Sequence, residues 1–235
     1  MQRAAYEDPA AFAEERQGLL AIIATETRET AVWTGREQLS PRVMAAMARV
    51  PRHLFVPRDE LAYAYANRPL SIGYGQTISQ PYIVAVMSDL LDLEPGDTVL
   101  EIGTGCGYQT AVLAELAGRV FSIEVVEALA AQAASRLRGL GYDTVSLRHG
   151  DGYAGWAEAA PFDAIIATAA PEEIPEALVQ QLKPGGRLVI PTGTARETQT
   201  LLRCVKEGDG SLTREEKLPV AFVPMVPGRV LPRLR

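Results

Sequence analysis

The sequence predicts an α/β fold, doubly wound around a mostly parallel sheet, with an N-terminal helical region and added C-terminal strands. Three observations support it. From residue 81 onward, short apolar runs alternate with helical segments, a pattern typical of parallel strands covered on both faces. The chain has 235 residues, 47% of them apolar, so it can bury one large core. Its 22% charged residues include both signs, and this composition excludes intrinsic disorder.

The first 80 residues are expected to form helices followed by a long loop. Apolar residues recur at helical spacing over residues 12–23. A second helix is predicted to begin after Ser40, a favoured N-cap, and to end at Pro51. Prolines and glycines then interrupt the pattern over residues 52–80, so we expect irregular, surface-running backbone there.

The rest of the chain is expected to form the sheet and the helices that cover it. A helix over 81–91 comes first, and helical segments at 109–117, 128–139 and 175–182 lie between or before later strands. We expect one domain over 1–235, with an N-terminal part (1–80), a ligand-binding core (81–199) and a C-terminal part (200–235). The expected strands are 98–102, 120–124, 145–149, 162–167 and 186–190 in the core, then 200–206 and 217–223.

Composition excludes several classes of function. The net charge of −6 argues against broad binding to nucleic acid or to an anionic membrane. Two histidines and two cysteines, all far apart, leave no metal-ligand spacing and no nucleophile dyad, so we expect no metal. No apolar run reaches the roughly 18 residues of a membrane span, and unclustered cysteines fit a reducing compartment, so the protein is expected to be cytoplasmic.

A glycine-rich turn joins the first core strand to the following helix. Gly103, Gly105 and Gly107 would let backbone N–H groups approach a ligand at the helix N-terminus. Glu124 ends the next strand, 21 positions after Gly103 (124 − 103), where a carboxylate can accept both hydroxyls of a ribose. The turn by itself is weak evidence, since a plain tight connection can have the same pattern, but together with Glu124 it predicts a nucleotide-like ligand.

Two further acidic positions indicate which class of nucleotide-like ligand is bound. Glu101 directly precedes the first glycine, where its charge would oppose a pyrophosphate but attract an ammonium and a sulfonium. The GxGxG spacing also departs from the GxGxxG of dinucleotide sites, so S-adenosylmethionine fits better than NAD. Asp151 and Gly152, after the third strand, could receive an adenine amino group, although alone they would be an ordinary Asp-Gly turn.

Over residues 39–226 the sequence resembles the protein-L-isoaspartate O-methyltransferases. The glycine turn is shared with most class I methyltransferases, whereas the run over 76–82 is specific to this family. The segments that carry the resemblance are IGYGQTISQPY (72–82), VLEIGTGCGYQ (99–109), HGDG (149–152), APFDAII (160–166) and LKPGGRL (182–188), with RHLFVP (52–57) and FVPMV (222–226) in support. The departures are Cys106, where serine is commoner, and Asn67, where an acidic residue is common.

The resemblance implies a Rossmann-like methyltransferase fold and esterification of the α-carboxylate of L-isoaspartyl residues in damaged proteins and peptides. The methyl donor would be S-adenosyl-L-methionine, the product S-adenosyl-L-homocysteine, and the ester would close to a succinimide that partly reopens as normal aspartate. By the same resemblance the active-site residue is Ser79. The implied cofactor-binding residues are Glu101, Gly103, Thr104, Gly105, Gly107, Glu124, Asp151 and Gly152, and the substrate-side residues are Thr77, Ile78 and Gln80. Gln199 is a further substrate-side candidate, which could bind the substrate backbone or the cofactor.

Such a reaction needs few catalytic groups. A carboxylate of pKa near 3.5 is already ionised at neutral pH and needs no general base, so the enzyme chiefly positions it and excludes water. Ser79 could donate the hydrogen bond that aims this carboxylate. Alternatively, Ser79 or Thr77 only caps the helix that begins at Pro81.

Two other functions remain open on the sequence. A peptide-tailoring methyltransferase would esterify an ordinary aspartate, and a binding module would hold the cofactor without turnover. The net negative charge of the chain disfavours a nucleic-acid methyltransferase. So does the sequence ATAAP at 167–171, after the fourth expected core strand, where an Asn-Pro-Pro-Tyr-like motif is absent. The oligomeric state is not predicted.

Overall fold

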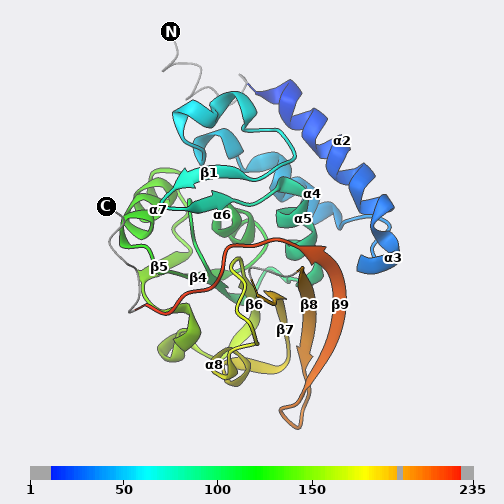
Figure 1. Ribbon diagram of the computed structural model, residues 1–235, viewed down its shortest axis with the longest axis vertical. Helices are drawn as coiled ribbons and strands as arrows, with labels where there is room; N and C mark the ends of the chain where they lie inside the picture. Colours follow the sequence, from blue (N-terminus) through cyan, green and yellow to red (C-terminus); the bar gives the residue numbers. More distant parts are fainter. Residues whose placement is uncertain (1–11, 195–197, 229–235) are drawn as a thin grey trace.

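The computed structural model describes residues 12–194 and 198–228, and its centre is a seven-stranded sheet (Figure 1). The strand order is β5-β4-β3-β6-β7-β8-β9. The first five strands in this order are parallel and the last two pairs are antiparallel, which confirms the predicted doubly wound α/β class. The strands are β3 (Thr98–Ile102), β4 (Arg119–Glu124), β5 (Val145–His149), β6 (Phe162–Ala167), β7 (Leu182–Thr192), β8 (Gln199–Lys206) and β9 (Leu212–Val220).

Helices cover both faces because successive residues of the buried strands point to opposite sides. In β3, Val99 belongs to one apolar core and Leu100 to the other. The first core also receives the N-terminal helices and the three helices α5 (Pro81–Leu90), α6 (Tyr108–Ala114) and α7 (Glu127–Gly139). The second receives Leu178 of α8 (Glu176–Gln180).

Both predicted N-terminal helices are present, as α2 (Ala13–Glu29) and α4 (Pro41–Arg49). A short helix between them, α3 (Ala31–Thr34), was not predicted. The Ser40 hydroxyl accepts a hydrogen bond from the backbone N–H of Val43, which confirms the predicted cap. Ile22 is 48% exposed, so it does not belong to the buried face of α2.

The prediction for residues 52–80 is wrong. This segment forms two 3₁₀-helices, η1 (Arg52–Leu54) and η2 (Arg58–Tyr63), and a hairpin of β1 (Leu70–Gly73) and β2 (Gln76–Ile78). It is also not confined to the surface, since many of its apolar side chains are buried in the core. Leu70 and Ile72 are buried and Ser71 between them is exposed, a period-two pattern that the neighbouring glycines obscured.

Two strand boundaries also differ from the prediction. The fifth core strand is longer than 186–190 and covers the whole of β7. The last strand begins at Leu212 rather than at 217 and ends at Val220, so residues 221–223 lie outside the sheet. β9 is an edge strand whose central residues, TREE at 213–216, are exposed, so its pairing leaves no apolar signal. Residues 229–235, at the end of the predicted C-terminal part (200–235), lie outside the described residues.

Candidate active site

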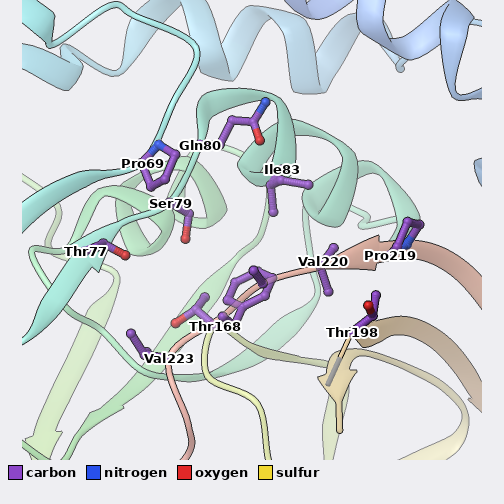
Figure 2. A pocket seen from close by; sticks show the side chains of 12 residues that line it. Pro69, Thr77, Ser79, Gln80, Ile83, Thr168, Thr198, Pro219, Val220 and Val223 are labelled. Atoms are coloured by element: carbon purple, nitrogen blue, oxygen red, sulfur yellow. The ribbon is translucent and has the colours of Figure 1, made fainter. Parts of the chain in front are cut away.

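A cavity of about 670 Å³ opens beside the β1–β2 hairpin. Ser79 lines it, and Figure 2 shows the Ser79 hydroxyl directed into the cavity, toward Thr168. Another wall consists of the end of β9 and the segment that follows it. The lining residues are Pro69, Thr77, Ser79, Gln80, Ile83, Thr168, Thr198, Pro219, Val220, Ala221, Phe222 and Val223.

A second cavity lies against the glycine turn. Thr77, Thr168 and Val223 line both cavities, so ligands in the two would meet at these residues. The residues that line the second cavity are Gln76, Thr77, Ile102, Gly103, Gly105, Ile123, Glu124, Val125, Gly152, Thr168, Ala169 and Val223 to Val226.

The glycine turn depends on backbone conformations that disfavour side chains. Gly103, Gly105 and Gly107 have φ values of 94°, 54° and 92°. Glu124, at the end of β4, holds the turn: its carboxylate accepts the N–H of Gly105 at 2.7 Å and that of Val126 at 2.8 Å. Since a carboxylate has about four acceptor positions, Glu124 can still receive further donors from a ligand in this cavity.

Glu101 lies beneath the turn and does not line either cavity. It is fully buried, and one carboxyl oxygen accepts hydrogen bonds from the hydroxyls of Thr110 at 2.5 Å and Ser122 at 2.6 Å. The other oxygen has no hydrogen-bond partner among the described residues. Burial raises the pKa of Glu101 to about 8, the two hydroxyls oppose this shift, and the charge of Glu124 adds to it.

The other predicted cofactor residues lie at different depths. Gly152 lines the second cavity, while the hydroxyl of Thr104 is buried against that of Ser122. Gly107 is the N-cap of α6. Asp151 caps the adjacent 3₁₀-helix by accepting the N–H of Tyr153 at 2.9 Å.

Hydrogen bonds from residues elsewhere in the chain hold the segment that carries Ser79. The helix after it has Gln80 as its N-cap, whose side chain makes no capping bond, and the N–H of Tyr82 is instead bound by the Asn67 amide oxygen at 3.0 Å. The alternative that Ser79 or Thr77 caps this helix is therefore wrong. The buried guanidinium of Arg52 donates to the carbonyl of Ser79 at 2.8 Å, which fixes the backbone at this residue.

The four predicted substrate-side residues differ in position. Thr77 and Gln80 line the larger cavity, whereas Ile78 is buried in the core. Gln199 is also buried, and its amide pairs with both backbone groups of Phe222, at 3.0 Å and 2.6 Å. Gln199 thus contacts the segment that lines the cavity rather than the cavity itself.

Thr168 is a site residue that the sequence reasoning missed. It follows β6, and its hydroxyl donates to the carbonyl of Gly103 at 2.6 Å. β3 and β6 are neighbours at the point where the strand order reverses, and such a point is where open α/β sheets bind ligands. The position of Thr168 in the sequence, directly after the fourth predicted core strand, could have indicated that it belongs to the site.

The comparisons with known proteins identify the family. The family model for protein-L-isoaspartate(D-aspartate) O-methyltransferase matches residues 28–230. The chain belongs to this family. A protein-L-isoaspartate O-methyltransferase 2 from Syntrophobacter fumaroxidans is 55% identical over 95% of this chain and 90% of its own. Another, from a Polaromonas species, is 56% identical over 88% of this chain and 98% of its own.

Solved structures agree with this assignment. A protein-L-isoaspartate O-methyltransferase structure superposes with a TM-score of 0.79 at 29% identity, covering 91% of this chain and 66% of that one. The Rossmann-like methyltransferase fold expected from the resemblance is thereby confirmed. Among the described residues, no helix is long and apolar enough to cross a membrane, and no group of three or more His, Cys, Asp or Glu could hold a metal ion.

Proposed function

We propose that this chain transfers a methyl group from S-adenosylmethionine to the α-carboxylate of isoaspartyl residues in damaged proteins and peptides. Membership of the isoaspartate O-methyltransferase family supports this function. The structural observation that carries it is the shared wall of the two cavities. Thr77, Thr168 and Val223 would separate a cofactor at the glycine turn from a peptide carboxylate at Ser79.

The residues of the smaller cavity fit the cofactor. Gly103 and Gly105 present backbone rather than side chains, and Glu124 lines the cavity with free acceptor positions for ribose hydroxyls. A solved structure from Plasmodium falciparum that shares this fold is a complex with S-adenosyl-L-homocysteine. When bound, S-adenosylmethionine supplies a methyl group on a positively charged sulfur that leaves as a neutral thioether.

The residues of the larger cavity then have a positioning task. One carboxylate oxygen forms a bond to the methyl carbon while the methyl–sulfur bond breaks, and its electron pair stays on sulfur. No proton moves, so neither a general acid nor a general base is needed. In our proposal Ser79 donates a hydrogen bond to the carboxylate and aims it, and Thr77 limits its approach to the shared wall.

A labelled-methyl transfer assay tests this function. It offers three matched peptides that carry an isoaspartyl residue, a normal aspartyl residue or no acidic residue. Labelling of the isoaspartyl peptide alone is the expected result. Equal labelling of the aspartyl peptide would instead indicate a peptide-tailoring enzyme, and no labelling despite cofactor binding would indicate a binding module.

A further inference from the structure

A carboxylate on α2 connects two segments that flank Ser79. Glu26 lies in the last turns of α2 and is half-buried. Its side chain accepts a hydrogen bond from the Asn67 amide at 2.5 Å and from the Gln80 amide at 3.2 Å. Asn67 precedes the β1–β2 hairpin and Gln80 directly follows Ser79. Glu26 also precedes residue 28, where the match to the family model begins.

Asn67 carries this connection one step further. While its amide nitrogen donates to Glu26, its amide oxygen accepts the N–H of Tyr82 at 3.0 Å. That N–H belongs to the first turn of α5, where backbone donors have no partner within the helix. One turn after Glu26, at the C-cap of α2, the hydroxyl of Thr30 hydrogen-bonds to the hydroxyl of Tyr82. α2 therefore contacts the chain at residue 80 and again at residue 82.

These contacts restrict the backbone around Ser79. Arg52 holds the Ser79 carbonyl from one side, and Glu26 holds the next residue, Gln80, from the other. In Figure 2 the Gln80 amide is directed away from Ser79 and the other labelled residues, while the Ser79 hydroxyl points among them. The amide of Gln80 thus serves as a tether to α2, and the hydroxyl of Ser79 is left to face the ligand.

We propose that Glu26 is a positioning residue for isoaspartyl methylation, which acts through Asn67 and Gln80 to hold Ser79 in place. This inference rests on the function proposed above. A reaction that depends on aligning a carboxylate is sensitive to such support, since a displacement of about 1 Å can cost about 100-fold in rate. α2, most of which precedes the residues matched by the family model, would then contribute to turnover without touching the substrate.

An exchange of the two hydrogen-bonding partners tests the proposal. Glu26→Ala removes the acceptor, and Gln80→Glu places a second carboxylate against Glu26. Each is expected to lower kcat for the isoaspartyl peptide about tenfold or more while the Kd for S-adenosylmethionine stays within about twofold. In the double variant E26Q/Q80E the amide of residue 26 donates to the carboxylate of residue 80 and its oxygen still accepts from Asn67. Its kcat should return to within about threefold of wild type.

Glu29→Ala, an exposed glutamate on the same helix, is the matched control and should leave kcat unchanged. The proposal is overturned if Glu26→Ala keeps wild-type kcat, or if the lost activity only follows a lost folded fraction by thermal unfolding. It is also overturned if E26Q/Q80E stays as impaired as Gln80→Glu, because Gln80 would then contact the substrate itself. A wild-type protein that does not label the isoaspartyl peptide would overturn the proposed function and this inference together.

Discussion

Ser79 is expected to serve the substrate and not the cofactor, because it lines the larger cavity and does not line the cavity at the glycine turn. Ser79→Ala should therefore lower kcat for an isoaspartyl peptide by about 100-fold, through loss of the hydrogen bond that aims the carboxylate. The Kd for S-adenosylmethionine, measured by calorimetry, should stay at its wild-type value. Ser71→Ala, at an exposed position on the hairpin that precedes Ser79, is the control. Near-normal turnover of Ser79→Ala would remove Ser79 from the mechanism.

The raised pKa of Glu101 predicts how the free energy of unfolding depends on pH. Its ordinary pKa is 4.5, and burial raises it to about 8 in the folded protein. Between these values the carboxyl is ionised in the unfolded chain and protonated in the folded one, so the free energy of unfolding falls as pH rises through this window. Below pH 4.5 both states are protonated and the effect vanishes.

Glu101→Gln resembles the protonated side chain and should remove this dependence. Its free energy of unfolding, measured in urea, should exceed that of wild type by an amount that grows from near zero at pH 4.5 to a few kcal/mol, in order of magnitude, at pH 8. A difference between variant and wild type that stays constant over this range would show that Glu101 is ionised in the folded protein.

At the scale of elements, the glycine turn depends on its contact with the loop after β6. A Cβ atom at Gly103 would lie 2.5 Å from the hydroxyl of Thr168, whereas a Cβ at Gly185, another glycine with positive φ, meets nothing within 4 Å. Gly185→Ala should therefore cost only about 1–2 kcal/mol for its backbone conformation. Gly103→Ala should cost at least about 1 kcal/mol more, because Thr168 must give up its hydrogen bonds.

Denaturant unfolding of both variants measures this difference, and calorimetry should show weakened cofactor binding for Gly103→Ala alone. Equal destabilisation of the two variants would show that the loop after β6 moves aside without cost.

The buried parallel strands were predictable from sequence because each is a short apolar run bounded by helices. β3 and β6 match their expected bounds. β1, β2 and β9 were missed or shifted because their signals are weak: the hairpin is short and rich in glycine, and β9 exposes charged residues. The predicted glycine turn and Glu124 do meet at one cavity, since both lie at the carboxyl ends of adjacent parallel strands.

At the scale of the whole molecule, the support of the site comes from segments that sequence patterns do not connect. Glu26 lies on α2, Arg52 on η1 and Asn67 before β1, and they reach the Ser79 segment only after the chain folds. Arg52 belongs to the family-like segment RHLFVP and Asn67 is a departure from the family pattern, but no pattern in the sequence indicates that the three side chains meet near Ser79. The carboxyl ends of the strands, in contrast, are brought together by any parallel sheet and could be foreseen.

The segment after β9 couples the two cavities, and Gln199 anchors it. Residues 222 and 223 line the larger cavity and residues 223–226 line the smaller one, while both backbone groups of Phe222 pair with the Gln199 amide. Gln199→Ala leaves these groups without their partner, a cost of about 1–3 kcal/mol in a buried place. We therefore expect the Kd for S-adenosylmethionine and the KM for the isoaspartyl peptide to rise together, each about tenfold.

Calorimetry and steady-state kinetics measure the two effects of Gln199→Ala separately. Gln180→Ala, an exposed glutamine on α8, is the control and should change neither constant. Ser79→Ala provides the decisive contrast, because that variant is expected to keep the wild-type Kd for S-adenosylmethionine. A Gln199→Ala protein that binds the cofactor normally would show that residues 223–226 keep their place without Gln199, and the two cavities would then be independent at this wall.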